Sequence, residues 1–399
     1  MKKKHIILGV ILLLLVALIS ASAGALFTFI HLSIQGPKDY KLNVLWNNIE
    51  KYYYEDGDRT AALHDAQEAS YYALVDSLGD PYSEYLSAED LAALKESMEG
   101  SYFGIGVTIY YDESSGYVTV AADPFENSPA SLAGILKDDK LIAVDEIQVA
   151  KDTMDKAVAY MRTPREETIH VMWLRGKEKM EADILPSDVV MQSVQVGQYE
   201  DIAYIRLTSF DENTTEEFAQ AMKSISSEST RGLILDLRNN PGGLMDAAVN
   251  ICDLLLPKGV VVYTKNKEGN RQDYTSNDFH YDLPMVVLVN DGSASASEIT
   301  AGALKAYQRA TLVGTTTFGK GIVQGVYPLA DGSALKLTNA RYFTPDDVCI
   351  HGTGIEPDVT VELPEDAGSI NPLEFDLSKD TQMKQAIDIL KKQYKRVLP

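Results

Sequence analysis

The chain has 399 residues, of which 45% are hydrophobic and 24% charged, and its formal net charge is −22 at pH 7. This length is sufficient for two or three domains that each bury a core. The acidic balance argues against nucleic acid as a partner, because a phosphate backbone would be repelled. The two cysteines, Cys252 and Cys349, lie in no metal-ligand spacing, so we expect no zinc site. Two free thiols or one disulfide between them both remain open.

The N-terminal segment differs in composition from the rest of the chain. Three lysines at positions 2–4 precede an uncharged stretch, 6–30, that is long enough to span a bilayer as a helix. The basic cluster predicts a cytoplasmic N-terminus and an exported body. The alternative is a cleaved signal peptide, since 21–23 reads Ala-Ser-Ala. Apolar residues continue to Ile30, so we favour a signal-anchor transmembrane segment at 1–31.

A helical region is predicted over 38–99. Apolar residues recur there at helical spacing, for example Leu42, Leu45, Trp46 and Ile49. A Gly-Asp-Pro sequence at 79–81 ends the second helix, and Ser87 followed by Asp90 marks the start of another.

A β-rich module is predicted over 100–185. Short apolar runs separated by turn residues are typical of strands, and one helix interrupts them at 154–161. The expected strands are 107–109, 118–120, 141–144, 168–173 and 180–184.

The region 186–365 is predicted to be an α/β domain, because strands and helices alternate along it. The expected strands are 201–207, 232–237 and 285–289, and the expected helices are 215–225, 244–256 and a segment that ends at Ala306. The tail, 366–399, contains a pattern over 380–395 that predicts an exposed amphipathic helix.

Two segments of the α/β region share one design, in which a buried strand leads through a turn of small residues into a helix. The first turn contains Pro241-Gly242-Gly243, and the second contains Ser293, Ser295 and Ser297. Backbone N–H groups in such turns attract developing negative charge, so a serine there is well placed to be a nucleophile. The alternative is that the three serines only cap the helix.

A nucleophilic serine requires a base, and none of the six histidines lies in a recognisable motif. The G-x-S-x-G elbow of α/β-hydrolases is also absent from the sequence. Lysine can serve as a base when burial or positive neighbours lower its pKa, and Lys320 lies between two glycines. A competing interpretation is a phosphate-binding loop over 314–320. Gly321 stands where such a loop needs Ser or Thr, and an apparent strand follows, so we disfavour nucleotide binding.

Several motifs spread over the exported chain form one set. They are Asp76 to Ser83, Tyr102 to Val107, Ser128 to Ile135, Asp236 to Gly243, Ser293 to Glu298, Thr317 to Gly321 and Gly354 to Asp358. This set resembles the carboxyl-terminal processing peptidases, which are the tail-specific serine proteases of peptidase family S41. One departure is Asp138-Asp139, where the family usually has Gly-Asp; it lies outside the catalytic motifs.

The resemblance implies an α/β fold with a ClpP/crotonase-like protease core at 186–365 and an inserted PDZ domain at 100–185. It implies that Ser295 is the nucleophile, that Lys320 is the base and that Gln324 orients the lysine. The family's oxyanion hole corresponds to the N–H groups of Gly242 and Ala296, with Gly243 equally plausible in place of Gly242. Its peptide-binding loop corresponds to Gly104, Ile105, Gly106 and Val107.

The expected function is therefore that of a serine endopeptidase at the cell membrane, with its catalytic body on the extracytoplasmic side. It would need no metal or cofactor and would cleave exported or membrane proteins near accessible, apolar C-termini. The alternatives are a non-catalytic PDZ scaffold and a peptidase that a partner must activate. The helical region and the tail helix would either form a homodimer contact or pack on the chain's own body.

Overall fold

The computed structural model describes residues 37–54, 58–225, 229–364 and 370–397. The transmembrane segment predicted at 1–31 lies outside these residues. No helix in the described ranges is both long and apolar enough to cross a bilayer. Contacts divide the chain after Leu74 into two compact units, which are described separately.

The first unit contains α2 (Pro37–Tyr52) and most of α3 (Arg59–Asp76), as the helical periodicity predicted. Asp58 precedes α3 and accepts a hydrogen bond from the Thr60 N–H at 3.0 Å, so it acts as the N-cap. Leu42 and Leu45 on α2 are more than half exposed.

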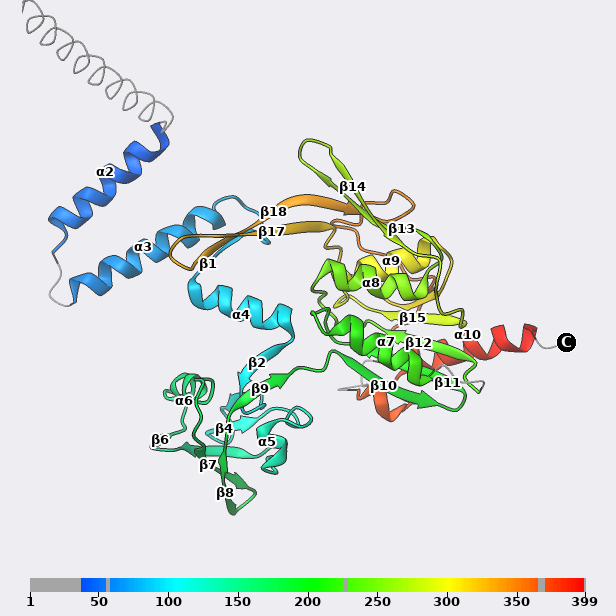
Figure 1. Ribbon diagram of the computed structural model, residues 1–399, viewed down its shortest axis with the longest axis horizontal. Coiled ribbons are helices and arrows are strands. Elements are labelled where there is room, and N and C mark those ends of the chain that lie inside the picture. The colour runs from blue at the N-terminus through cyan, green and yellow to red at the C-terminus, as the bar shows by residue number, and fades with distance from the viewer. Residues whose placement is uncertain (1–36, 55–57, 226–228, 365–369, 398–399) are drawn as a thin grey trace, which may run out of the picture. The chain divides into compact units, whose positions relative to one another are not determined.

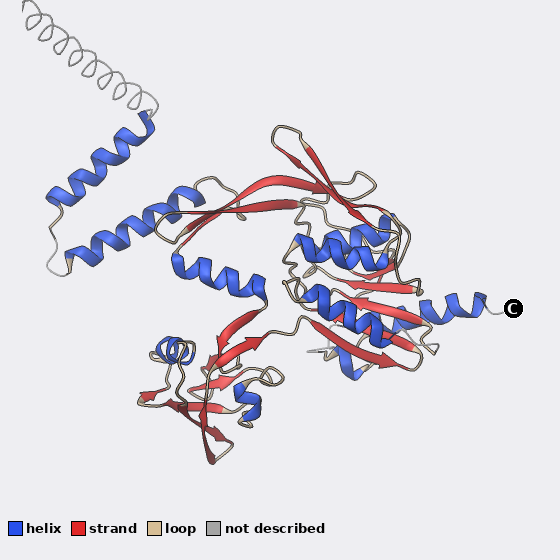
Figure 2. Ribbon diagram, viewed as in Figure 1, coloured by secondary structure: helices blue, strands red, loops and turns tan. Residues whose placement is uncertain are grey.

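The second unit is built on a six-stranded, mostly parallel sheet (Figures 1 and 2). Its strands, in spatial order, are β10 (Val194–Tyr199), β11 (Ile202–Leu207), β12 (Gly232–Asp236), β15 (Met285–Val289), β16 (Thr311–Gly314) and β19 (Val359–Thr360). Only β10 runs antiparallel to its neighbour. The predicted α/β character of this region is confirmed.

Helices cover both faces of this sheet, and alternate residues of each strand serve the two faces. Leu233 and Leu235 face the core shared with α7 (Thr214–Ile225), α8 (Met245–Leu255) and α9 (Ala296–Ala306). Ile234 faces the opposite core, which α10 (Thr381–Val397) closes. The prediction of an exposed tail helix was wrong. The apolar face of α10 is buried on the sheet through Met383, Ala386, Ile387 and Leu390.

A second sheet carries the other side of the site. Its strands are β1 (Glu84–Leu86), β18 (Ala334–Phe343), β13 (Gly259–Asn266), β14 (Arg271–Ser276) and β17 (Ile322–Pro328). The long β18 pairs with β1, β13 and β17. This pairing brings the segment before β1 to the base of β17, although some 240 residues separate them in the sequence. A helix, α4 (Ala88–Glu99), follows β1 and has the predicted Ser87–Asp90 capping box.

The segment after α4 has a hydrophobic core of its own, which includes the buried Trp173. Its elements are β2 (Ser101–Gly104), β3 (Ile109–Asp112), β4 (Tyr117–Val120), α5 (Pro129–Leu132), β5 (Lys140–Val144), β6 (Ile147–Gln148), α6 (Met154–Met161), β7 (Ile169–Arg175), β8 (Glu178–Ile184) and β9 (Ser187–Val190). The first expected strand, 107–109, instead begins at Ile109. Gly106 has a φ of +89°, which interrupts the extended chain before it.

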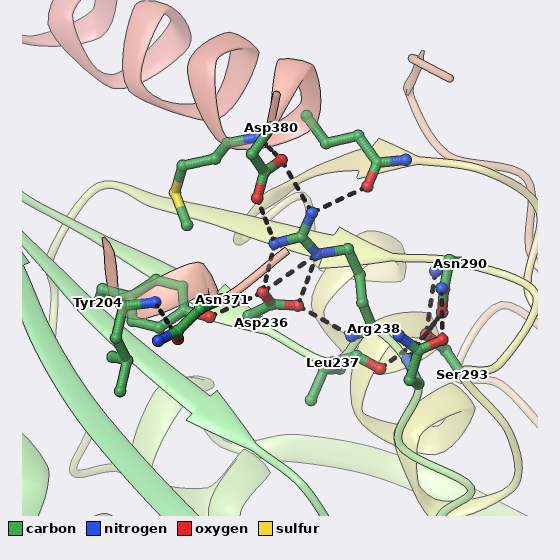
Figure 3. Close-up of polar contacts among 12 residues, drawn as sticks. Tyr204, Asp236, Leu237, Arg238, Asn290, Ser293, Asn371 and Asp380 are labelled. Carbon is green, nitrogen blue, oxygen red and sulfur yellow. Dashed lines mark hydrogen bonds and ion pairs between the residues drawn. The ribbon is translucent and has the colours of Figure 1, made fainter. Parts of the chain in front are cut away.

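A buried ion network ties the end of β12 to the start of α10 (Figure 3). The Arg238 guanidinium contacts Asp236 at 2.7 Å and Asp380 at 2.9 Å, and Tyr204 donates to Asp236 at 2.8 Å. Burial by itself would raise the pKa of Asp236, but the adjacent Arg238 outweighs it and lowers that pKa. The buried charges therefore compensate one another. Removal of one of them would leave an uncompensated charge in the low-dielectric interior.

We predict that Asp380→Ala destabilises the protein by about 3–5 kcal/mol, because it leaves half of a buried Arg238 unpaired. It also removes the cap of α10, where Asp380 accepts from the Met383 N–H at 2.8 Å. Urea unfolding measures the effect, and Asp388→Ala, an exposed change on the same helix, is the control. Equal stability of the two variants would contradict the prediction.

Candidate active site

A glycine turn connects β12 to α8 and forms one wall of the candidate site. Gly242 and Gly243 have φ values of +100° and +141°, which side chains disfavour. A Cβ on Gly242 would lie 2.9 Å from the Cβ of Ser295. Only glycine therefore allows this turn to lie directly against the serine turn.

The serine turn follows β15, and the structure separates the roles of its three serines. Ser293 and Ser297 are buried, and their hydroxyls donate to the carbonyls of Leu237 and Asn240 at 2.7 and 2.9 Å. These bonds fasten the serine turn to the glycine turn. Ser295 instead lines an open cavity, with a φ of +53° that is unusual for serine. Strained backbone of this kind is concentrated at functional sites.

A cavity of about 310 Å³ brings the predicted residues Ser295, Lys320 and Gln324 together. Lys320 is half-buried and takes part in no ion pair within the described part of the chain. Burial lowers the pKa of its ammonium, and the positive charge of Lys336, another residue of the cavity lining, lowers it further. Glu84 and Asp80 oppose this shift. The net direction favours the neutral amine.

The carboxylate of Glu298 links the two turns that carry Ser295 and Lys320. It is fully buried in the first turn of α9. It accepts hydrogen bonds from the N–H groups of Ser295, Gly319 and Lys320 at 2.9, 2.7 and 2.8 Å. The Thr317 hydroxyl adds a fourth bond at 2.6 Å. These donors and the helix N-terminus compensate the buried charge.

The sequence interpretation placed Glu298 only within a motif and assigned it no role. The available signal was its position three residues after Ser295, which is where an acidic side chain reaches back to the N-cap N–H. Tyr82 was likewise placed only within the motif Asp76 to Ser83, and Lys336 was missed altogether, because both lie in segments of the sequence other than the one that carries Lys320.

The candidate oxyanion donors differ in their availability. The Gly242 N–H donates to the side-chain oxygen of Asn240 at 2.9 Å, and Gly242 is buried. Gly243 is exposed and lines the cavity beside Ser295. Ala296 is the first residue of α9, where backbone N–H groups have no partner within the helix.

A separate groove of about 310 Å³ lies in the β-rich segment. One side is the predicted loop Gly104, Ile105, Gly106 and Val107, and the other is the end of α6, with Val158, Met161 and Arg162. The Arg162 guanidinium contacts Glu96 of α4 at 2.9 Å and lies over the Tyr102 ring at 4.6 Å. The lining of the groove is thus mainly apolar.

The cysteines are both free; Cys252 is buried and Cys349 half-buried. Burial raises the pKa of the Cys252 thiol to about 12, so it stays protonated and inert. Across the described ranges, no three His, Cys, Asp or Glu side chains gather in a way that could hold a metal ion.

Comparison with known proteins places this geometry in a family. Residues 201–361 match the model of peptidase family S41. A carboxyl-terminal-processing protease of Synechocystis sp. is 37% identical over 79% of this chain and 74% of its own length. A carboxy-terminal-processing protease of Bartonella bacilliformis is 38% identical over 71% of this chain and 67% of its own length.

The fold agrees with that placement. The solved structure of a Bacteroides fragilis protein assigned to the S41 proteases matches 79% of this chain and 87% of that chain, with a TM-score of 0.51 at 16% identity. The chain therefore belongs to peptidase family S41, whose members are serine peptidases. Within that family its relatives are the carboxyl-terminal processing proteases, as the sequence motifs predicted.

We predict that Glu298→Gln lowers peptidase activity at least about 100-fold and stability by about 1–3 kcal/mol, because the amide cannot accept all four bonds. Peptide cleavage and thermal unfolding measure these effects. Glu216→Gln, an exposed acid in the first turn of α7, is the matched control. A Glu298→Gln enzyme with unchanged activity would show that the link between the turns is dispensable.

Proposed function

We propose that the chain is a Ser–Lys endopeptidase that cleaves proteins near their C-termini. The observation that carries the proposal is the single cavity that Ser295, Lys320 and Gln324 line together. The Glu298 carboxylate supports the proposal, because it accepts hydrogen bonds from the backbone N–H groups of both Ser295 and Lys320.

In the proposed reaction, the neutral Lys320 amine takes the Ser295 proton as the hydroxyl oxygen attacks a peptide carbonyl. The resulting lysine ammonium then donates a proton to the leaving amine, and Lys320 next activates the water that hydrolyses the acyl-enzyme. A lowered lysine pKa matters because a lysine with an ordinary pKa near 10.4 would be almost wholly protonated at neutral pH.

We assign the oxyanion hole to the N–H groups of Ala296 and Gly243. Gly243 replaces the family-based choice of Gly242, whose N–H already donates to Asn240. Two backbone donors aimed at the developing charge typically contribute the largest single share of rate enhancement in acyl transfer.

The β-rich segment is proposed to be a PDZ domain that binds the C-terminus of the substrate. Backbone amides of the Gly104 to Val107 loop, which lines the groove, would receive the terminal carboxylate, and the apolar lining of the groove suits an apolar last residue. The predicted membrane anchor at 1–31 would hold this body at the outer side of the membrane.

We predict that Ser295→Ala and Lys320→Ala each reduce cleavage of an unstructured reporter protein at least about 1,000-fold. Lys320→Arg should be equally inactive, because a guanidinium stays protonated. In the wild type, kcat/KM should rise with pH through the lowered pKa of Lys320, since only the neutral amine is a base.

Ser224→Ala and Lys177→Ala, both exposed, are the matched controls for that experiment. Cleavage by Lys320→Ala at the wild-type rate would overturn the dyad. A wild type that binds the reporter without cleaving it would establish the scaffold alternative instead.

We also predict that a peptide with an apolar, free C-terminus binds at least about 10-fold more tightly than the same peptide with a C-terminal amide. Val158→Asp should remove this preference, because it places a charge in the apolar groove. Fluorescence anisotropy with the Ser295→Ala protein measures binding without cleavage. Leu132→Asp, at a residue 78% exposed in the same segment, is the control. Equal affinity for both peptides would exclude carboxylate recognition.

A further inference from the structure

The turn at 80–83 lies beside Lys320, although it precedes the part of the chain that matches the peptidase family model, 201–361. Its shape is set by Asp80, whose carboxylate accepts from the Tyr82 N–H at 3.1 Å and the Ser83 hydroxyl at 2.6 Å. The Ser83 hydroxyl in turn accepts from the Thr338 N–H of β18 at 3.1 Å. The turn is therefore fixed to the sheet that carries the base.

Tyr82, in this turn, contacts the side chains of both Lys320 and Gln324. The Lys320 Nζ lies 5.2 Å from the centroid of the Tyr82 ring, within the range of a cation–π interaction. The Tyr82 carbonyl accepts a hydrogen bond from the Gln324 side-chain amide. His351 packs edge-on against the Tyr82 ring, with a centroid distance of 6.2 Å.

We propose that Tyr82 is a positioning residue for the general base: its ring stabilises the ammonium that Lys320 becomes on taking the Ser295 proton, and its carbonyl fixes Gln324. This inference rests on the proposed function and extends it to a residue outside the peptidase core.

The magnitude of a cation–π interaction suits this role. An ion pair with a carboxylate would hold Lys320 in its charged form before the reaction began. A ring contributes only about 0.5–2 kcal/mol, so the amine remains accessible while the ammonium formed during proton transfer is stabilised.

The other charged groups around Lys320 act on its pKa in both directions. Lys336 of β18 disfavours the ammonium, whereas Glu84 of β1, Asp80 of the turn and Glu298 of α9 favour it. Lys336 and Glu84 form an ion pair with each other, and their effects on Lys320 are opposite in sign. His351 contacts the Tyr82 ring and would disfavour the ammonium only when protonated.

The test compares rings of equal shape and unequal charge distribution at position 82, in the full chain. Tyr82→Phe keeps the quadrupole of the ring, and phenylalanine with three ring fluorines largely removes it. The fluorinated protein should show the acid limb of its kcat/KM profile moved down by about 0.5–1 pH unit relative to Tyr82→Phe, since the ammonium is less stabilised. Its plateau should fall about 3- to 10-fold.

Tyr82→Leu should show the same downward shift of the acid limb and a larger loss of rate, because the shape of the side chain beside Lys320 also changes. Tyr117→Leu is the matched control, since Tyr117 holds Lys140 at 5.0 Å from its ring in the β-rich segment. The Tyr117→Leu control should leave both the acid limb and the plateau of the kcat/KM profile unchanged.

Two results would overturn the proposal. The first is coincident pH profiles for the phenylalanine and fluorinated proteins. The second is loss of activity in Tyr82→Leu with an unmoved acid limb, which would indicate a purely structural role. Lys320→Ala, measured in parallel, separates the two hypotheses: if it is active the dyad fails, and if it is inactive only the role of Tyr82 is in question.

Discussion

The arrangement of the site depends on one buried carboxylate. Glu298 has no cationic partner among the described residues, and four hydrogen bonds offset its charge. Three of these come from backbone N–H groups on two separate turns, so the bonds fix main chain and not merely side chains. Because an unsatisfied buried carboxylate is very unfavourable, either turn can move only if the other moves with it. The placement of Ser295 relative to Lys320 is a consequence of this constraint.

The second requirement is a lysine that is free of permanent counter-ions yet held in place. The structure meets it with groups from four segments: Lys336 on β18, Glu84 on β1, the Tyr82 turn and the α9 carboxylate. Desolvation is the main cause of the lowered pKa of Lys320, and the positive charge of Lys336 adds to it, whereas the carboxylates oppose it. Residues 80–84, which precede the part of the chain that matches the family model, thus take part in the electrostatics around Lys320.

The sheet that carries these turns is itself held by contacts with α10, on the face opposite to α7, α8 and α9. Arg238 connects the carboxyl end of β12, where the glycine turn begins, to Asp380 at the start of α10 (Figure 3). Sequence patterning alone predicted α10 but not its burial. An amphipathic period reports that one face is apolar, and it cannot tell whether that face meets solvent, another chain or the same sheet. The contact between Arg238 and Asp380, which are 142 residues apart, shows that α10 packs on the same sheet.

Local residue order by itself determined much of this protein. Apolar periodicity gave the helices and the strands of the α/β region, and the motif set identified the family with Ser295 and Lys320 as its candidate pair. Only the tertiary structure supplied a physical reason to set Ser295 apart from the other two serines, because the hydroxyls of Ser293 and Ser297 donate to the carbonyls of Leu237 and Asn240. It alone showed that the Gly242 N–H already has a hydrogen-bond acceptor and that Tyr82 lies beside Lys320. The physical reason is that hydrogen-bond partners and charge neighbours are set by chain segments remote in sequence, which no local pattern encodes.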